Sequence, residues 1–147
     1  MTRGELEDRL ARDHARLRGK SAVLRSLALG FLRGDADLAE TLVLKGRDLQ
    51  QSLIEHMNWE EDVLVPNLRR ASPEASRVAE RIHDEHRGQR VQLVRSIRDL
   101  SDKPSPAPGA GDETAGMEDV AREFLELTER LERDMATEES TLGALPG

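Results

Sequence analysis

The chain has 147 residues, no cysteine and a formal net charge of −7. This length suits one domain with its own core, and the absence of cysteine excludes disulfides, thiolate metal ligands and cysteine nucleophiles. Nucleic acid is an improbable partner, because the net charge is negative and the arginines are spread over every segment instead of forming a basic face. No apolar run is long enough for a signal peptide or a membrane span, so we expect a cytoplasmic protein with no membrane partner.

Charged residues make up 35% of the sequence and aromatic residues 2%, which favours helices over sheets. The first helix is expected over about residues 5–31. Asp35 or Asp37 can cap the second helix, which should continue to about residue 70. Pro66 should disturb the last turns of that helix, because proline has no amide hydrogen to donate.

The third helix is expected to begin at Ser72-Pro73-Glu74, which provides a cap, a proline at the first position and an acid in the first turn. It should extend to about residue 100. Residues 102–116 are rich in Pro, Gly, Ala and acids, so we expect a flexible loop there. The fourth helix then covers about residues 117–142. The sequence thus predicts an all-α fold, a single antiparallel up-down-up-down four-helix bundle over residues 1–147.

The 3,4 spacing of a bundle seam places six ionisable residues among the aliphatic residues of the predicted core. They are His14, His56, Glu60, His86, Asp134 and Glu138. Burying a carboxylate without a partner costs on the order of several kcal/mol, and no lysine or arginine occupies these inward positions. A cation bound by the histidines and carboxylates is the simplest compensation.

The second and fourth helices carry the same pattern, His/Asp-Met-x-x-Glu-Glu-x-x-Leu, at residues 56–64 and 134–142. Side chains at positions i and i+4 project from one face of a helix. Each of these helices can therefore contact both metals of a two-metal site, which is built symmetrically from facing helices in carboxylate bundles.

The segment from His56 to Pro66 resembles the second-helix motif of the hemerythrin-like HHE cation-binding family, His-x-x-x-Glu-Glu followed by an aliphatic pair and proline. Asp13-His14, Glu85-His86 and the segment from Asp134 to Glu138 match the other helices of that family in order. The resemblance covers nearly the whole chain.

By this resemblance Glu60 and Glu138 would bridge two metals. His14 and His56 would be terminal ligands of one metal, and His86 with Asp134 would serve the other. The resemblance implies two iron ions, with manganese or zinc as alternatives. His83 is expected at the rim of the site, and Glu61, Glu85 and Glu139 are expected to be solvated or to support the ligands.

The chain departs from the family pattern at two positions. Asp134 replaces the fourth-helix histidine, and Ile82 stands where oxygen-carrying hemerythrins have another histidine. An added carboxylate favours the ferric state, which argues against reversible oxygen carriage. We therefore expect a di-iron protein that binds or reacts with dioxygen, peroxide or nitric oxide. If it is an enzyme, it would be a di-iron oxidase or a peroxidase or catalase-like oxidoreductase. The alternatives are an oxygen or iron sensor without turnover, metal storage, and a metal-free structural bundle.

Overall fold

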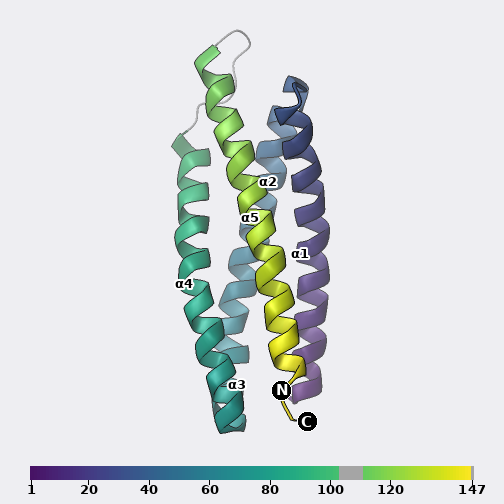
Figure 1. The fold of residues 1–147 in the computed structure, drawn as a ribbon, viewed down its shortest axis with the longest axis vertical. Coiled ribbons are helices and arrows are strands. Elements are labelled where there is room, and N and C mark those ends of the chain that lie inside the picture. Colours follow the sequence, from purple (N-terminus) through teal and green to yellow (C-terminus); the bar gives the residue numbers. More distant parts are fainter. Residues whose placement is uncertain (103–110, 147) are drawn as a thin grey trace.

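The computed structural model describes residues 1–102 and 111–146, and these form four long helical rods packed side by side (Figure 1). The expected all-α bundle is confirmed, and the described residues contain no strand. In chain order the elements are α1 (Arg3–Leu32), the 3-10 turn η1 (Ala36–Leu38), α2 (Ala39–Trp59), the π-turn η2 (Glu60–Leu64), α3 (Val65–Ala71), α4 (Pro73–Asp102) and α5 (Gly111–Gly143).

The first rod begins with a capping box. The Thr2 side chain accepts a hydrogen bond from the backbone amide of Glu5, and the Glu5 carboxylate accepts one from the amide of Thr2. After α1 the chain turns at Gly34, whose φ of 112° lies in the region that glycine tolerates best. These two signals delimit a helix close to the one that the sequence predicts.

The second rod is not one continuous α-helix. The amide of Val65 donates to the carbonyl of Glu60, five residues back, which defines the wider turn of η2. Pro66 follows at the start of α3. In a regular α-helix its ring would crowd the carbonyl of Asp62, so a wider turn just before it relieves that contact. The disturbance expected from Pro66 is therefore a π-turn, a feature that often accompanies functional sites.

The fourth rod begins earlier than expected. α5 starts at Gly111, whereas the sequence pattern predicts a start near residue 117. Residues 103–110 of the expected flexible loop lie outside the described residues.

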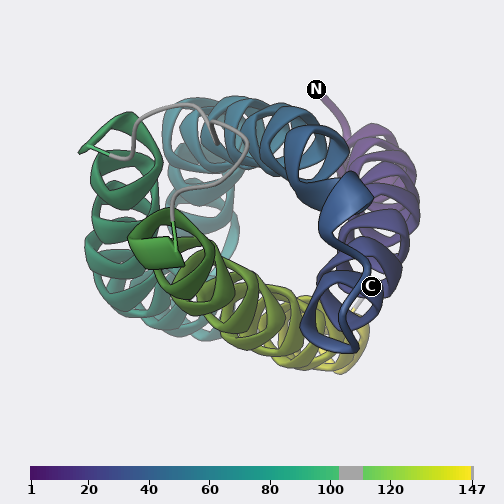
Figure 2. The same ribbon diagram turned by 90° about the horizontal axis from the view of Figure 1, so that it is seen from above.

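Seen along the bundle axis, the rods occupy the corners of a square (Figure 2). α1 packs against α2 and α5, while α4 packs against α3 and α5. The two chain ends lie together at one end of the bundle (Figure 1), where the Arg3 guanidinium donates to the carbonyls of Leu142 and Leu145, each at 3.1 Å. None of the described helices combines the length and the apolar character that crossing a membrane would require.

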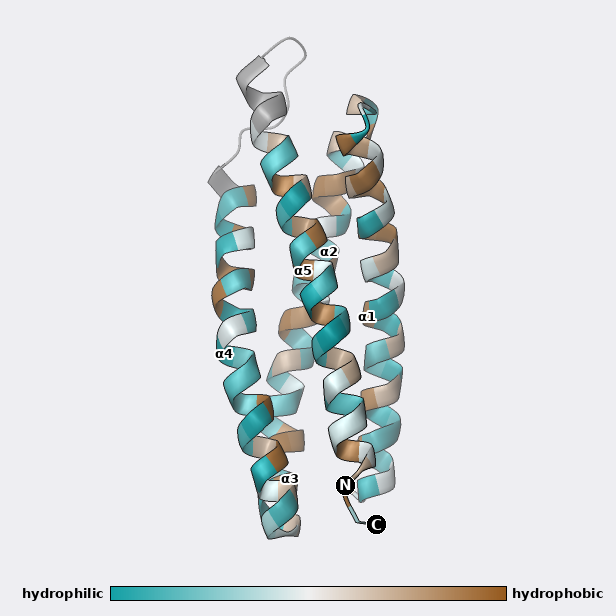
Figure 3. Cartoon of the chain, in the orientation of Figure 1, coloured by the Kyte–Doolittle hydropathy of each residue, from teal (hydrophilic) through white to brown (hydrophobic). Residues whose placement is uncertain are grey.

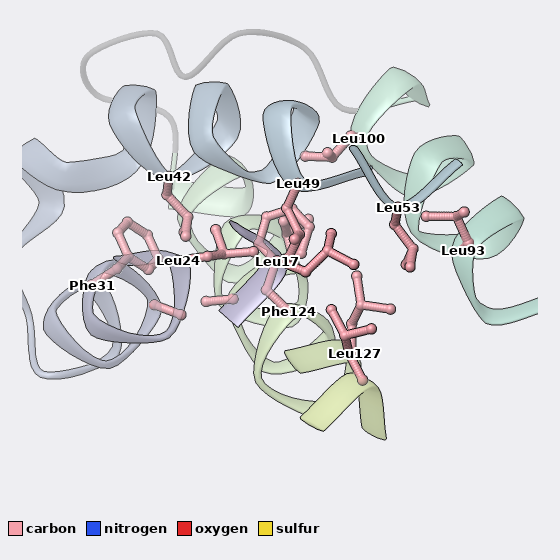
Figure 4. Packing of buried hydrophobic residues seen from close by; sticks show 14 of the residues in the cluster. Leu17, Leu24, Phe31, Leu42, Leu49, Leu53, Leu93, Leu100, Phe124 and Leu127 are labelled. Carbon is pink, nitrogen blue, oxygen red and sulfur yellow. The ribbon is translucent and has the colours of Figure 1, made fainter. Parts of the chain in front are cut away.

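Each rod alternates polar and apolar residues along its length (Figure 3), and the apolar side chains form two separate buried clusters. The larger cluster draws on all four rods, with Leu17, Leu49, Leu93 and Phe124 among its members (Figure 4). The smaller cluster lies toward the chain ends and includes Leu6, Leu10, Trp59, Ile82 and Leu142.

On α1 and α5, buried polar side chains separate the two clusters. On α1 His14 falls between Leu10 of the smaller cluster and Leu17 of the larger one. On α5 Glu138 falls between Met135 of the larger cluster and Leu142 of the smaller. The fold therefore positions a buried polar layer, with apolar packing above and below it.

Candidate metal centre

Five of the six predicted ligands lie in this polar layer, and all of the rods contribute. The side chains are buried, with relative exposures of 0% for His14 on α1, 5% for His56 on α2, 1% for Glu60 on η2, 3% for His86 on α4 and 6% for Glu138 on α5. Residues that are far apart in the sequence thus converge as the seam spacing predicts.

These side chains form two groups that could each hold a metal ion. One group consists of His14, His56 and Glu138, and the other of Glu60, His86 and Glu138. Within each group the potential ligand atoms lie within 4.8 Å of one another. Glu138 belongs to both groups, so its carboxylate lies between the two candidate metal positions.

Glu60 also links the two groups. Its Oε1 atom lies 2.6 Å from Nε2 of His56 and 3.4 Å from Nε2 of His86. On the other side, Nε2 of His14 lies 3.2 Å from Oε1 of Glu138. Both carboxylates therefore occupy the central position that a bridging ligand needs.

The polar atoms of this layer fit a bound cation. His14 Nε2, Glu60 Oε2, His86 Nδ1 and Glu138 Oε1 are buried without a hydrogen-bond partner. Buried polar atoms in folded proteins are almost always hydrogen-bonded, so a cluster of unpartnered ones indicates a binding site. A metal ion would satisfy the inward-facing atoms, and imidazole with carboxylate is a donor set that suits iron, manganese or zinc.

The two central carboxylates have opposite pKa shifts. Burial and the facing charge of Glu60 raise the pKa of Glu138 well above its ordinary value. Burial would also raise the pKa of Glu60, but hydrogen bonds from His56, His86 and Glu138 outweigh it and lower the pKa. The Glu138 carboxyl group therefore keeps its proton to a higher pH than the Glu60 carboxyl group does.

The pKa values of His14 and His56 are shifted in opposite directions. Burial lowers the pKa of His14 despite its contact with Glu139. Burial also acts to lower the pKa of His56, but its hydrogen bonds to Glu60 and Asp13 outweigh burial and raise the pKa. Glu60 thus holds a charged or strongly polarised partner in the absence of metal, a role that a cation would take over.

A carboxylate lies behind each ring, at the nitrogen that faces away from the centre. His14 Nδ1 lies 2.9 Å from Glu139 and His56 Nδ1 lies 3.2 Å from Asp13, whereas His86 Nδ1 lies 3.6 Å from Glu61, beyond hydrogen-bond distance. The sequence predicts that Glu61 and Glu139 are solvated or support the ligands, and the structure places both behind ligand rings. Sequence reasoning missed Asp13, which follows no local spacing rule because it supports a ring on the neighbouring rod.

The sixth predicted ligand, Asp134, lies outside both groups. Its Oδ2 atom accepts a hydrogen bond from Gln89, and the Arg130 guanidinium lies 3.7 Å from the same oxygen. The Asp134 side chain is 23% exposed. After burial, Glu60 and Glu85, the charge of Asp134 also raises the pKa of Glu138, so Asp134 is close enough to act on the centre electrostatically.

The remaining residues singled out by the sequence lie at the edge of the site. Ile82 is buried in the smaller apolar cluster. His83 is half-buried and belongs to neither ligand group. Burial and the charge of Asp134 raise the pKa of Glu85, which is half-buried beside the centre.

A four-rod helical bundle with two adjoining histidine and carboxylate groups in its core defines a cation-binding bundle protein. The sequence profile of the family described as "Hemerythrin HHE cation binding domain" matches residues 6–145, and the chain belongs to this family. Comparison with curated proteins gives no match, and neither does comparison with solved structures.

Proposed function

We propose that this chain is a non-haem di-iron protein whose centre binds or reacts with dioxygen, peroxide or nitric oxide. The observation that supports it is the sharing of carboxylates. Glu138 belongs to both ligand groups, and one oxygen of Glu60 contacts histidines of both. Carboxylates that face two cation positions at once are the hallmark of paired metal ions in helical bundles.

The residues divide unevenly between the two positions. His14 and His56 would hold one iron, and His86 would hold the other, with Glu60 and Glu138 between them. The His86 position has fewer protein ligands unless Asp134 joins it, so we expect a small exogenous ligand to bind on that side. Bound iron would supply the one-electron chemistry that the side chains lack.

The surroundings favour small neutral ligands. Apolar clusters pack on both sides of the polar layer, which keeps water scarce and strengthens electrostatic interactions within the layer. Dioxygen, nitric oxide and hydrogen peroxide are small and uncharged, so they fit such surroundings better than a bulky or ionic substrate.

Metal analysis of the purified protein tests the first part of the proposal. We expect about two iron ions per chain, and we expect Glu60→Ala and Glu138→Ala each to lose both ions, because each carboxylate faces both positions. Glu80→Ala is the matched control, since Glu80 pairs with Arg69 on the surface and belongs to neither ligand group. Full iron occupancy in both site variants would refute the two-metal assignment.

Reaction with oxygen tests the second part. The anaerobically reduced protein should develop ferric absorption on rapid mixing with oxygenated buffer, without a long-lived reversible adduct. A reversible adduct would indicate oxygen carriage or sensing instead. A centre that holds iron but remains ferrous under oxygen would indicate metal storage, and the proposed reactivity would be wrong.

A further inference from the structure

Three chains of arginine, carboxylate and histidine run from the surface of the bundle to the candidate metal centre. In the first, Arg18 of α1 donates to both oxygens of Glu139 on α5, at 2.7 and 3.0 Å. Glu139 Oε1 then lies 2.9 Å from Nδ1 of His14. The outer pair is half-exposed, at 35% and 39%, whereas the His14 side chain is fully buried.

The other two chains repeat this order. Arg9 donates to Asp13 at 3.1 Å, and Asp13 Oδ2 lies 3.2 Å from Nδ1 of His56. The third chain consists of Arg90, Glu61 and His86, with 2.7 Å between the guanidinium and the carboxylate and 3.6 Å between the carboxylate and the ring. Every histidine of the two ligand groups therefore has an arginine-paired carboxylate behind it.

Each chain also joins two rods. The Arg18 chain connects α1 with α5, the Arg9 chain connects α1 with α2, and the Arg90 chain connects α4 with η2. Each carboxylate is thus fixed from two sides, by the arginine and by the ring. Ordinary surface ion pairs in this protein, such as Arg69 with Glu80, end at the carboxylate and reach no buried group.

We propose that Glu139 and Asp13, each braced by its arginine, are positioning residues that keep a hydrogen on Nδ1 of His14 and His56, and that these two carboxylates and Glu61 set the reduction potential of the metal pair. This inference deepens the proposed function, because its second half rests on the bound metal. Its first half concerns the metal-free protein alone.

The donor and acceptor inventory supports the positioning role. A neutral imidazole carries one ring hydrogen, and an ionised carboxylate can only accept. A carboxylate at Nδ1 therefore holds the hydrogen there and leaves the lone pair of Nε2 directed at the centre. Nε2 of His14, His56 and His86 is the nitrogen that lies against Glu138 or Glu60. Such partners also make the ring a stronger metal ligand.

The opposite charges of the carboxylate and its arginine predict opposite effects on the reduction potential of the metal pair. A carboxylate near the centre stabilises the ferric state, while its arginine partially cancels that effect. Removing the Glu139 charge should therefore raise the reduction potential, and removing the Arg18 charge should lower it. A contact that served packing alone would shift the potential in the same direction when either partner was replaced.

Nitrogen NMR of the metal-free protein at a mildly alkaline pH tests the positioning role. In the wild type we expect the hydrogen of His14 on Nδ1, and in Glu139→Leu we expect a mixture of the two tautomers. Glu80→Leu is the control and should leave the spectrum of His14 unchanged. A hydrogen on Nε2 in the wild type, or an unaltered tautomer in Glu139→Leu, would overturn the positioning role whatever metal the protein binds.

Redox titration of the iron-loaded protein tests the second half. Glu139→Gln keeps an acceptor but loses the charge, so it should retain most of the metal affinity and raise the potential, whereas Arg18→Gln should lower the potential. Glu139→Leu should lose about 10- to 100-fold in metal affinity. Shifts of the same sign in Glu139→Gln and Arg18→Gln, or no shift in either, would show that the pair does not tune the metal. Failure to load iron at all would refute the proposed function and leave the NMR result standing.

Discussion

Gln89 competes with any metal for the carboxylate of Asp134. The amide of Gln89 donates to Asp134 Oδ2, and Arg130 lies 3.7 Å from the same oxygen. Coordination by Asp134 would require this hydrogen bond to break, whereas Glu60 and Glu138 already face the centre. The ligand role of Asp134 therefore stays a prediction, and the iron content of substituted proteins can test it.

We expect Asp134→Asn to lower the iron content less than Glu138→Gln does, because only Glu138 belongs to both ligand groups. Gln89→Leu should tighten iron binding by freeing the Asp134 carboxylate. Metal titration of the three variants in parallel provides the comparison. Equal losses in Asp134→Asn and Glu138→Gln would mean that Asp134 is a full ligand in the loaded protein.

The raised pKa of Glu138 makes metal binding pH-dependent. Burial and the Glu60 charge raise this pKa, so the Glu138 carboxyl group keeps its proton to a higher pH than an ordinary glutamate does. A metal needs the ionised form and must displace that proton. Affinity should therefore rise with pH up to the pKa of Glu138 and then level off, and calorimetry in buffers of different ionisation enthalpy should detect the released proton. Affinity that does not change with pH would contradict the raised pKa of Glu138.

The raised pKa of Glu138 also determines how the stability of the metal-free protein changes with pH. A carboxyl group whose pKa is higher in the folded than in the unfolded protein binds more protons when folded. The free energy of unfolding of the metal-free protein should then fall as pH rises from the unfolded pKa toward the folded pKa. The lowered pKa of Glu60 acts in the opposite direction, since its contribution is lost as pH falls below the unfolded pKa.

Five of the ligand candidates could be found from seam spacing, because a histidine or glutamate among regularly spaced leucines must be buried and therefore needs a partner. The supporting contacts could not be found in this way. Asp13 and Gln89 act on residues of other rods, and only the three-dimensional register brings them together. Spacing within one helix carries no information about such contacts.

At the scale of single elements, the position of the π-turn could not be predicted from the sequence. Pro66 predicts a disturbance of the helix, but the wide turn lies before it in the chain, from Glu60 to Leu64. The extra residue in this turn rotates the following helix relative to α2. Glu60 can thus face the centre while Val65 and Leu68 still reach the smaller apolar cluster. A helix of uniform pitch would satisfy one of these requirements less well.

Gly46 of α2 leaves room for the ring of Phe124, which extends from α5 across the core. A Cβ atom at this position would overlap the ring of Phe124, which is fully buried. Gly46→Ala would gain about 1 kcal/mol in helix propensity but would lose roughly 1 to 3 kcal/mol through overpacking. We expect a net loss of stability, measured by chemical denaturation.

Gly19 of α1 provides the matched control, because no atom lies within 4 Å of a Cβ built there. Gly19→Ala should stabilise the protein by up to about 1 kcal/mol, through helix propensity alone. If Gly46→Ala were also stabilising, the Phe124 ring would have to move freely, and the close contact between this ring and position 46 would be wrong.

At the scale of the molecule, the bundle itself could be predicted from the regular apolar spacing and the caps. The π-turn within the second rod and the start of α5 could not, because both leave weak signals in a sequence. The division of the core into two clusters was not predicted either, because seam positions do not show which apolar side chains touch across rods.

Removal of the metal should lower the thermal stability of the whole domain. Without a cation, Glu60 and Glu138 remain buried side by side with unpartnered oxygens, and a ligand that binds only the folded state stabilises that state by mass action. Calorimetry before and after chelation, with metal loss confirmed, should show a lower melting temperature. Chelation of the Glu60→Gln, Glu138→Gln double variant should have little effect. An unchanged melting temperature in the wild type would mean that the buried pair is not costly.

The polar layer between the two apolar clusters also bears on the order in which the molecule assembles. The larger cluster contains the fully buried leucines of α1 and α2 together with Phe124, so it has enough apolar surface to condense early. The smaller cluster is separated from it by the buried histidines and glutamates of the candidate metal centre. A cation bound there would join groups from all four rods, so it would connect the second half of the interior to the first. The smaller cluster should accordingly be the part of the interior that loosens first when such a cation is removed.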